Sequence, residues 1–284
     1  MATLRDIKTR IKSVRQIQKI TAAMKMVAAA RLRKLQQAQE RFQPFEKALG
    51  DLCEPMRRLV RVQDHPFLQE RPGANVWMIV LTSERGLCGA YDHNIENAAR
   101  KFIRQSGSKK VSLLVAGRKG LSYFRNRGYQ LLEIDWPEGV ERRCKKLAFF
   151  LRKSYLSGEV DEVHVIYDRL QLDRVRGIKV VRVLPLPEPS PEEVTSPVRL
   201  SSCLMEPGFD GVFARLTEMI IFRQLYTYLL DAAAGEEFAR MNAMEQATDN
   251  ADDLIFNLTL AFNKARQEAI TTELMDILGG AQVA

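Results

Sequence analysis

Apolar residues recur at helical spacing over both ends of the chain. In residues 3–58 the steps are mostly three and four, and no glycine precedes Gly50. Residues 209–278 repeat the pattern, with Gly235 as the weak point in the interior. The stripe positions of the first segment are Leu4, Ile7, Ile11, Val14, Ile17, Met24, Val27, Leu35, Phe42, Phe45, Leu49 and Leu52. Because a long helix cannot bury such a stripe alone, we expect the two ends to pair as an antiparallel coiled coil.

The middle of the chain has a different pattern. Short apolar runs rich in β-branched residues alternate there with amphipathic stretches, which predicts a small, mostly parallel, Rossmann-like sheet with flanking helices. The expected strands are 76–82, 111–116, 129–134, 163–167 and 178–184, and the expected helices are 92–105, 118–127 and 141–156.

These patterns divide the chain into four parts. The fold class is α/β plus a long antiparallel α-helical coiled coil formed by the two ends. A proline-rich stretch predicts an extended linker between the sheet and the last helix. The expected parts are an N-terminal coiled-coil helix (1–58), an α/β globular domain (75–184), a linker (185–208) and a C-terminal coiled-coil helix (209–284).

Charge separates the two ends. Lys and Arg total 43 against 35 Asp and Glu, a net charge of +8, and residues 1–34 hold ten of those bases with Asp6 as their acid. Residues 212–284 hold eleven acids and five bases. Basic residues surround the apolar stripe on several sides and no aromatic residue precedes Phe42. We therefore expect this end to be a solvated face, or one that meets acidic protein, rather than a surface that binds nucleic acid.

Composition excludes several classes of protein. Hydrophobic residues make up 46% of the chain, which excludes wholesale disorder. No apolar run approaches the ~18 residues of a membrane span, so we expect no direct membrane insertion. The four cysteines are scattered without a CxxC pair, which makes a zinc site or a disulfide framework unexpected. We expect no metal, no cofactor and no catalytic residue.

A glycine-rich turn follows the first expected strand. Gly86, Cys88 and Gly89 precede a helix, an arrangement that can cradle phosphate, although a complete GxGxxG or Walker motif is missing. Cys88 could instead be a nucleophile with His93 or His164 as its base. The interpretation we favour is a tight structural turn.

Three segments resemble the gamma subunit of F-type ATP synthases. They are QIQKITAAMKMVAAARLRK (16–34), TSERGLCGA (82–90) and ARMNAMEQATDNADDLIFNLTLAFNKARQEAI (239–270), in the family's order along the chain. Asn242 and Glu245 depart from the family, which commonly has an apolar and a basic residue at these positions. The resemblance implies two terminal helices enclosing a small α/β domain.

The resemblance also implies a function and its partners. In this family the coiled coil turns inside a hexamer of alpha and beta subunits, and its base stands on the membrane ring of c subunits beside the epsilon subunit. Met24 with Lys25 matches the position that faces the lever loop of the beta subunit. Arg266 and Gln267 match the pair that hydrogen-bonds the catch loops of the hexamer.

Two other functions remain as alternatives. The basic composition and long helices also fit a coiled-coil scaffold or a nucleic-acid-binding protein. The other alternative is a stand-alone enzyme with Cys88 as its nucleophile. The sequence start, MATLRDIKTR, shows no apolar signal segment. We expect a bacterial protein that is peripheral on the cytoplasmic face of the plasma (inner) membrane. Whether protons or sodium ions drive the ring depends on ligands in another subunit.

Overall fold

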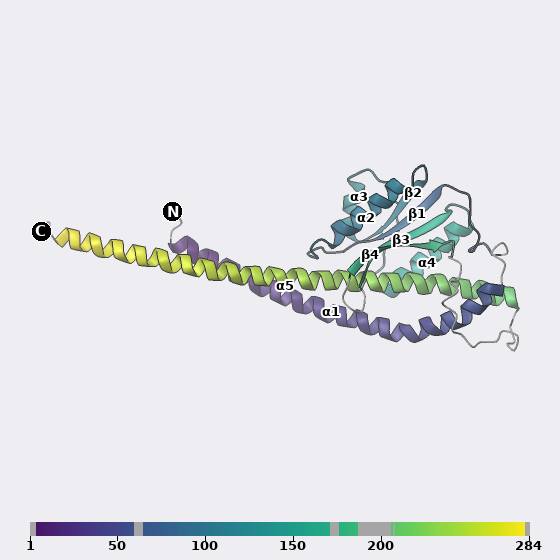
Figure 1. Ribbon diagram of the computed structural model, residues 1–284, viewed down its shortest axis with the longest axis horizontal. Helices are drawn as coiled ribbons and strands as arrows, with labels where there is room; N and C mark the ends of the chain where they lie inside the picture. The colour runs from purple at the N-terminus through teal and green to yellow at the C-terminus, as the bar shows by residue number, and fades with distance from the viewer. Residues whose placement is uncertain (1–3, 60–64, 171–175, 187–205, 207, 282–284) are drawn as a thin grey trace. The chain divides into compact units, whose positions relative to one another are not determined.

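A computed structural model of the protein describes residues 4–59, 65–170, 176–186, 206 and 208–281 (Figure 1). Most of the predicted linker, 187–205 and 207, lies outside these residues. The elements in chain order are α1 (Leu4–Leu59), β1 (Asn75–Leu81), α2 (Tyr91–Gln105), β2 (Lys110–Ala116), α3 (Arg118–Arg125), α4 (Val140–Leu156), β3 (Glu162–Leu170), β4 (Arg176–Leu184) and α5 (Phe209–Ala281). The predicted fold class is confirmed.

The chain divides into two compact units. One consists of residues 31–239 and contains the sheet, and the other combines Met1–Ala30 with Arg240–Ala284. We call them the globular unit and the shaft unit. Each contains a stretch of both long helices.

The sheet of the globular unit is mixed. Its strand order is β2-β1-β3-β4, with β1 parallel to both β2 and β3, and β3 antiparallel to β4. The prediction of a mostly parallel sheet therefore holds for two of its three pairings. The predicted strand 129–134 is wrong, because it contributes only an isolated parallel bridge between Leu131 and Leu113. Its backbone hydrogen bonds to β2 are confined to Leu113, although Leu131 and Leu132 still pack against the two cores of the sheet.

Apolar side chains of the sheet alternate between two cores. Trp77, Ile79 and Leu81 of β1 face a core shared with α4, α5 and α1. Met78 and Val80 face a second core shared with α2 and α3. Figure 1 shows the sheet between these helices within the globular unit. Burial on both faces explains why β1 is almost continuously apolar.

The two long helices also pair within the globular unit. Gln39 donates to the Asp231 carboxylate over 2.7 Å. Arg223 Nη1 lies 3.7 Å from Glu46 Oε1, and this pair is further along α1 and earlier along α5 than the first. Residue numbers therefore rise on one helix as they fall on the other, which is the antiparallel pairing that the sequence predicts.

Candidate functional site

In the shaft unit, α1 and α5 are held together by polar side-chain pairs and by the close packing of small side chains. Gln18 donates to the carboxylate of Asp252, and Lys25 Nζ lies 2.7 Å from Glu245 Oε1. Between them the hydroxyl of Thr248 lies 2.8 Å from that of Thr21. The pairs run 18 with 252, 21 with 248 and 25 with 245, so the helices are antiparallel here as well.

The core of the shaft unit is narrow. Its buried positions include Thr21 and Ala28 on α1, and Met244 and Ala251 on α5. Two alanines and a threonine at a helix contact let the helix axes approach closely, since their side chains take little room. A slender pair with a small apolar core results.

Large apolar side chains remain outside this contact. Ile17, Ile20 and Val27 on α1 are exposed, Ile17 by 53%. The spacing of these residues puts them with Met24 on one side of the helix. On α5, Phe256 is 65% exposed and lies one turn before the exposed Leu260. Expecting the partner helix to bury the whole stripe was wrong at Ile17 and Val27, because α1 presents the face of Thr21 and Ala28 to α5 instead.

Met24 and Lys25 lie on α1 in the shaft unit, a few residues before its boundary at Ala30. Met24 is half-buried, and the Lys25 side chain is 41% exposed while it pairs with Glu245. Glu245 was recognised in the sequence only as a departure from the family pattern. In the structure it is the partner of Lys25 across the helix pair.

Arg266 and Gln267 are exposed on α5. Continuing the pairing of the shaft unit places Arg266 opposite Leu4, where α1 begins. The backbone carbonyl of Gln267 accepts a hydrogen bond from the Thr271 hydroxyl over 2.9 Å within the helix. Both residues therefore lie on α5 level with the described start of α1.

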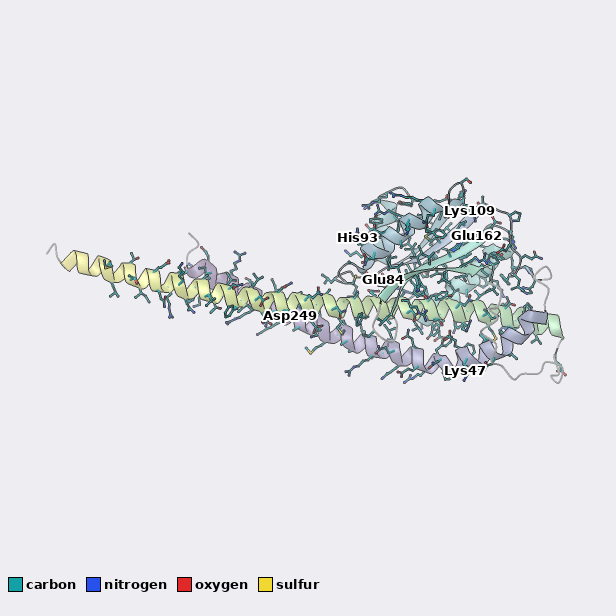
Figure 2. The ribbon with its side chains drawn as sticks, viewed as in Figure 1. Lys47, Glu84, His93, Lys109, Glu162 and Asp249 are labelled. Atoms are coloured by element: carbon teal, nitrogen blue, oxygen red, sulfur yellow. The ribbon has the colours of Figure 1, made fainter. Side chains whose placement is uncertain are left out.

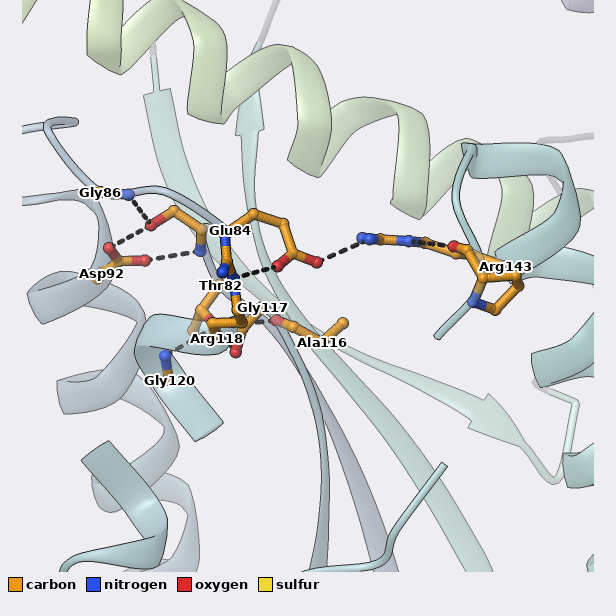
Figure 3. Close-up of polar contacts among 11 residues, drawn as sticks. Thr82, Glu84, Gly86, Asp92, Ala116, Gly117, Arg118, Gly120 and Arg143 are labelled. Carbon is orange, nitrogen blue, oxygen red and sulfur yellow. Dashed lines mark hydrogen bonds and ion pairs between the residues drawn. The ribbon is translucent and has the colours of Figure 1, made fainter. Parts of the chain in front are cut away.

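The turn after β1 is held by its own side chains (Figure 3). Ser83 donates through its amide and hydroxyl to the Asp92 carboxylate, over 2.8 and 2.6 Å. The Gly86 amide donates to Ser83 Oγ over 3.1 Å. Glu84 pairs with Arg143 at 2.7 Å. The loop thus connects β1, α2 and α4 inside the globular unit.

Glycine is required where this turn tightens. Gly86, Leu87 and Gly89 all have positive φ values, of 75°, 58° and 60°. In the neighbouring loop, a Cβ on Gly117 would lie 2.2 Å from the Thr82 carbonyl oxygen. The loops after β1 and β2 therefore pack so closely that a side chain at Gly117 would not fit.

The two chemical alternatives for this turn find little support in its geometry. Asp92 occupies the first turn of α2 and accepts from Ser83, so a carboxylate stands where a phosphate would bind. Cys88 is buried and its Sγ lies 3.5 Å from Asp92 Oδ2. His93 is exposed on α2 (Figure 2). His164 is paired with Met78 in the middle of β1, well before the turn.

One buried carboxyl group lies beside the turn. Glu96 on α2 is 7% exposed. Burial, followed by the Asp92 carboxylate, raises the pKa of Glu96 from 4.5 to about 7, and Arg127 and Arg100 oppose the rise. Glu96 is thus a titratable group of the globular unit near neutral pH.

No group of three metal-ligating side chains occurs in the described part of the chain. None of the helices that the structure describes is long and apolar enough to cross a membrane. Cys53, Cys88 and Cys144 are buried, and Cys203 lies outside the described residues.

Sequence reasoning missed two features of the surface. It did not identify the Lys25–Glu245 pair or the outward position of Ile17 and Val27. A signal for the first was present, since a base and an acid stand at mirrored positions of two segments expected to pair. For the second there was none, because an exposed apolar stripe has the same spacing as a buried one.

Comparison with solved structures agrees with the fold. The central stalk and c-ring of the Tetrahymena thermophila mitochondrial ATP synthase contains a chain with a TM-score of 0.60 and 24% identity, covering 80% of this chain and 99% of that one. A chain of the Euglena gracilis mitochondrial ATP synthase has a TM-score of 0.64 and 16% identity, covering 99% and 94%. These identities support the fold alone.

Sequence comparison extends over the full length. The family model described as ATP synthase matches residues 3–283. The ATP synthase gamma chain of Desulforamulus reducens is 37% identical over 285 residues, covering 99% of both chains. That of Pelotomaculum thermopropionicum is 38% identical over 284 residues, again covering 99% of both. With this agreement from end to end, and with the paired terminal helices around a small sheet, the chain belongs to the family of ATP synthase gamma chains.

Proposed function

We propose that this chain is the central-stalk gamma subunit of a proton-translocating F-type ATP synthase, where it acts as the rotating shaft. The observation that carries the proposal is the match to gamma chains over 99% of the sequence. The antiparallel pairing of α1 with α5 supplies the physical basis, because two packed helices resist bending and twist better than one. The subunit itself catalyses no reaction.

The shaft acts by changing binding equilibria in its neighbours. Rotation presents different sides of an asymmetric surface to each beta subunit in turn, and so alters nucleotide affinity there. The two helices of the shaft unit supply that asymmetry. Ile17, Ile20 and Val27 make one side of α1 apolar, while Lys25 and Glu245 form a charged position. Through the same contacts the shaft regulates ATP hydrolysis.

Two contacts with the hexamer are proposed by residue. Met24 and Lys25 face the lever loop of the beta subunit. Carboxylates of that loop pair with Lys25 only if they compete successfully with Glu245. Such an exchange is inexpensive, because a half-exposed ion pair contributes about 0–1 kcal/mol. Arg266 and Gln267 bind the catch loops, and their exposure on α5 leaves an Arg fork free to meet a carboxylate.

The remaining partners follow from the same proposal. The alpha and beta subunits surround the shaft, the c-ring drives it, and the epsilon subunit lies beside the globular unit. The complex belongs at the cytoplasmic face of the bacterial inner membrane, with this chain as a peripheral component. We assign Gly86, Cys88 and Gly89 a structural role in the turn, and keep the division into 1–58, 75–184, 185–208 and 209–284 as a working description.

Reconstitution tests the function directly. The full chain is combined with alpha and beta subunits, and a probe is attached to an exposed position of the globular unit such as Lys101. We expect ATPase activity to appear and the probe to revolve in one direction. Activity without rotation, or no assembly with a hexamer, would contradict the proposal.

The catch contact has its own test. Arg266→Ala combined with Gln267→Ala removes both polar side chains and should impair ATP-driven proton pumping in the reconstituted enzyme without preventing assembly. Glu268→Ala, also exposed on α5, is the matched control. Unchanged pumping in the double variant would eliminate this contact.

For the lever contact, Met24→Lys places a second cation beside Lys25. We expect coupling to fall while the complex still assembles, because a half-buried lysine disturbs both Lys25 and the facing carboxylates. Met24→Leu conserves the volume and should remain coupled. Failure of Met24→Lys to assemble would indicate a packing role instead.

A further inference from the structure

Helix α4 carries an unusual charge for a helix that covers a sheet. Its 17 residues contain one acid, Glu141, and six bases, which are Arg142, Arg143, Lys145, Lys146, Arg152 and Lys153. Its inner face is apolar, since Cys144, Leu147 and Leu151 are buried against the sheet. The bases therefore lie on and around the outward side of the helix.

The outward side also presents large apolar groups. Phe149 is 63% exposed and Leu156 is 51% exposed. Together with Lys145 and Arg152 they stand at helical spacings of four, three and four, so all four lie on one side of α4. This side extends over twelve residues, from Lys145 to Leu156, which is about 16 Å at 1.5 Å per residue.

A hollow borders this side of α4. It has a volume of about 500 Å³ and lies between α4, α1 and α5 within the globular unit. Its apolar lining comes from all three helices: Phe45, Ala148, Phe149, Met219, Ile221 and Phe222. Volumes of this size accommodate one or two large side chains or a small ligand.

Cations predominate at the rim of the hollow. Lys145, Arg152 and Arg215 stand there with Glu218 as the acid. Glu218 pairs with both arginines, with Arg215 at 3.0 Å, so two positive charges share one negative charge. Because these pairs are partly exposed, each contributes about 0–1 kcal/mol and can be exchanged for a carboxylate of a partner.

We propose that the α4 groove, defined by the hollow and by Lys145, Phe149, Arg152 and Leu156, binds an amphipathic acidic helix of a partner protein. An apolar side chain of that helix enters the hollow beside Phe149, and Asp or Glu residues on its flanks pair with Arg152, Arg215 and Lys145. Exposed aromatic and arginine side chains around a pocket are typical anchors of such interfaces. The length of this side of α4, about three helical turns, favours a helix over a small molecule.

The isolated full chain provides the first test. The probe is a synthetic amphipathic helix of about 14 residues, apolar on one side with Glu on both flanks, and the matched peptide has Lys in place of Glu. We expect the acidic peptide to bind at least about ten-fold more tightly, and added salt to reduce the difference. Equal binding of the two peptides, or no saturable binding, would overturn the proposal.

Variants locate the binding on α4. Phe149→Asp should weaken the acidic peptide at least about ten-fold, since it places a carboxylate beside the hollow. Arg215→Glu, at a side chain that is already well exposed, should do the same without disturbing the core. The control is Lys101→Glu on the exposed side of α2. Loss of binding in the control as large as in Phe149→Asp would refute a specific groove.

The assembled complex provides the second test. A photoreactive benzoylphenylalanine at position 149 should form an adduct with a carboxylate-rich helical segment of another subunit, identified by mass spectrometry. An adduct with lipid, or no protein adduct in a complex that still pumps protons, would overturn the α4 groove. Such a result would leave the proposed rotary function intact, because pumping is measured in the same preparation.

Discussion

Glu96 allows a quantitative test of the globular unit through pH. The side chain is 7% exposed, and burial together with the Asp92 carboxylate raises its pKa from 4.5 to about 7. A folded state that prefers the protonated acid is favoured at low pH and loses that advantage as pH rises from 4.5 to about 7. Stability contributed by Glu96 should therefore fall between pH 5 and pH 8.

The size of the effect follows from the shift. Each pKa unit corresponds to 1.36 kcal/mol, so a group moving from 4.5 to about 7 should lose about 2.5 kcal/mol between pH 5 and pH 8. The side chain keeps 7% of its surface exposed, so solvent screens part of the charge. We therefore expect a measured loss of about 1–2.5 kcal/mol from this one residue.

The variant Glu96→Gln removes the titration while keeping the shape of the side chain. Urea unfolding of the full chain at pH 5 and pH 8 should show that Glu96→Gln is the more stable protein at pH 8, with a smaller loss between the two. Glu133→Gln, whose side chain is 88% exposed, is the control and should follow the unchanged chain. An identical pH dependence for the unchanged chain and Glu96→Gln would refute the argument.

Two further predictions concern the packing of each unit. Gly117→Ala places a Cβ 2.2 Å from the Thr82 carbonyl oxygen at a φ of 105°, and should lower the free energy of unfolding by at least about 2 kcal/mol. Gly128→Ala is the control, because its Cβ would meet no atom within 4 Å, and it should lower the free energy of unfolding by about 1 kcal/mol. Comparable urea midpoints for the two variants would contradict this prediction. Lys25→Glu should destabilise the shaft unit by about 0.5–1 kcal/mol, and adding Glu245→Lys should restore most of it in thermal unfolding at low salt; no restoration would mean that the pair is not formed.

The sequence predicted the helices and strands closely because their signals are local. Unbroken helical spacing with no early glycine indicated α1, and β-branched runs indicated β1, β2, β3 and β4. The segment 129–134 shows the limit of such signals. Its apolar residues resemble those of the other strands, but its pairing with β2 is limited to a single bridge at Leu131. Strand formation depends on a neighbour with a matching length, which periodicity does not reveal.

The candidate contact residues were predicted by resemblance rather than by their chemistry. Met24, Lys25, Arg266 and Gln267 are ordinary side chains on long helices, and a family motif selected them. The neighbours of these residues could be identified only from the structure. Glu245 became informative only when the antiparallel pairing placed it 2.7 Å from Lys25.

The sequence by itself determined that this protein has two long terminal helices, a central sheet with flanking helices, and the motifs of a gamma chain. Only the tertiary structure decided which apolar side chains are covered. Thr21 and Ala28 form the contact with α5, whereas Ile17, Val27 and Phe149 face outward. The physical reason is that spacing along a helix defines an apolar face, while burial depends on the shape and distance of whatever packs against it.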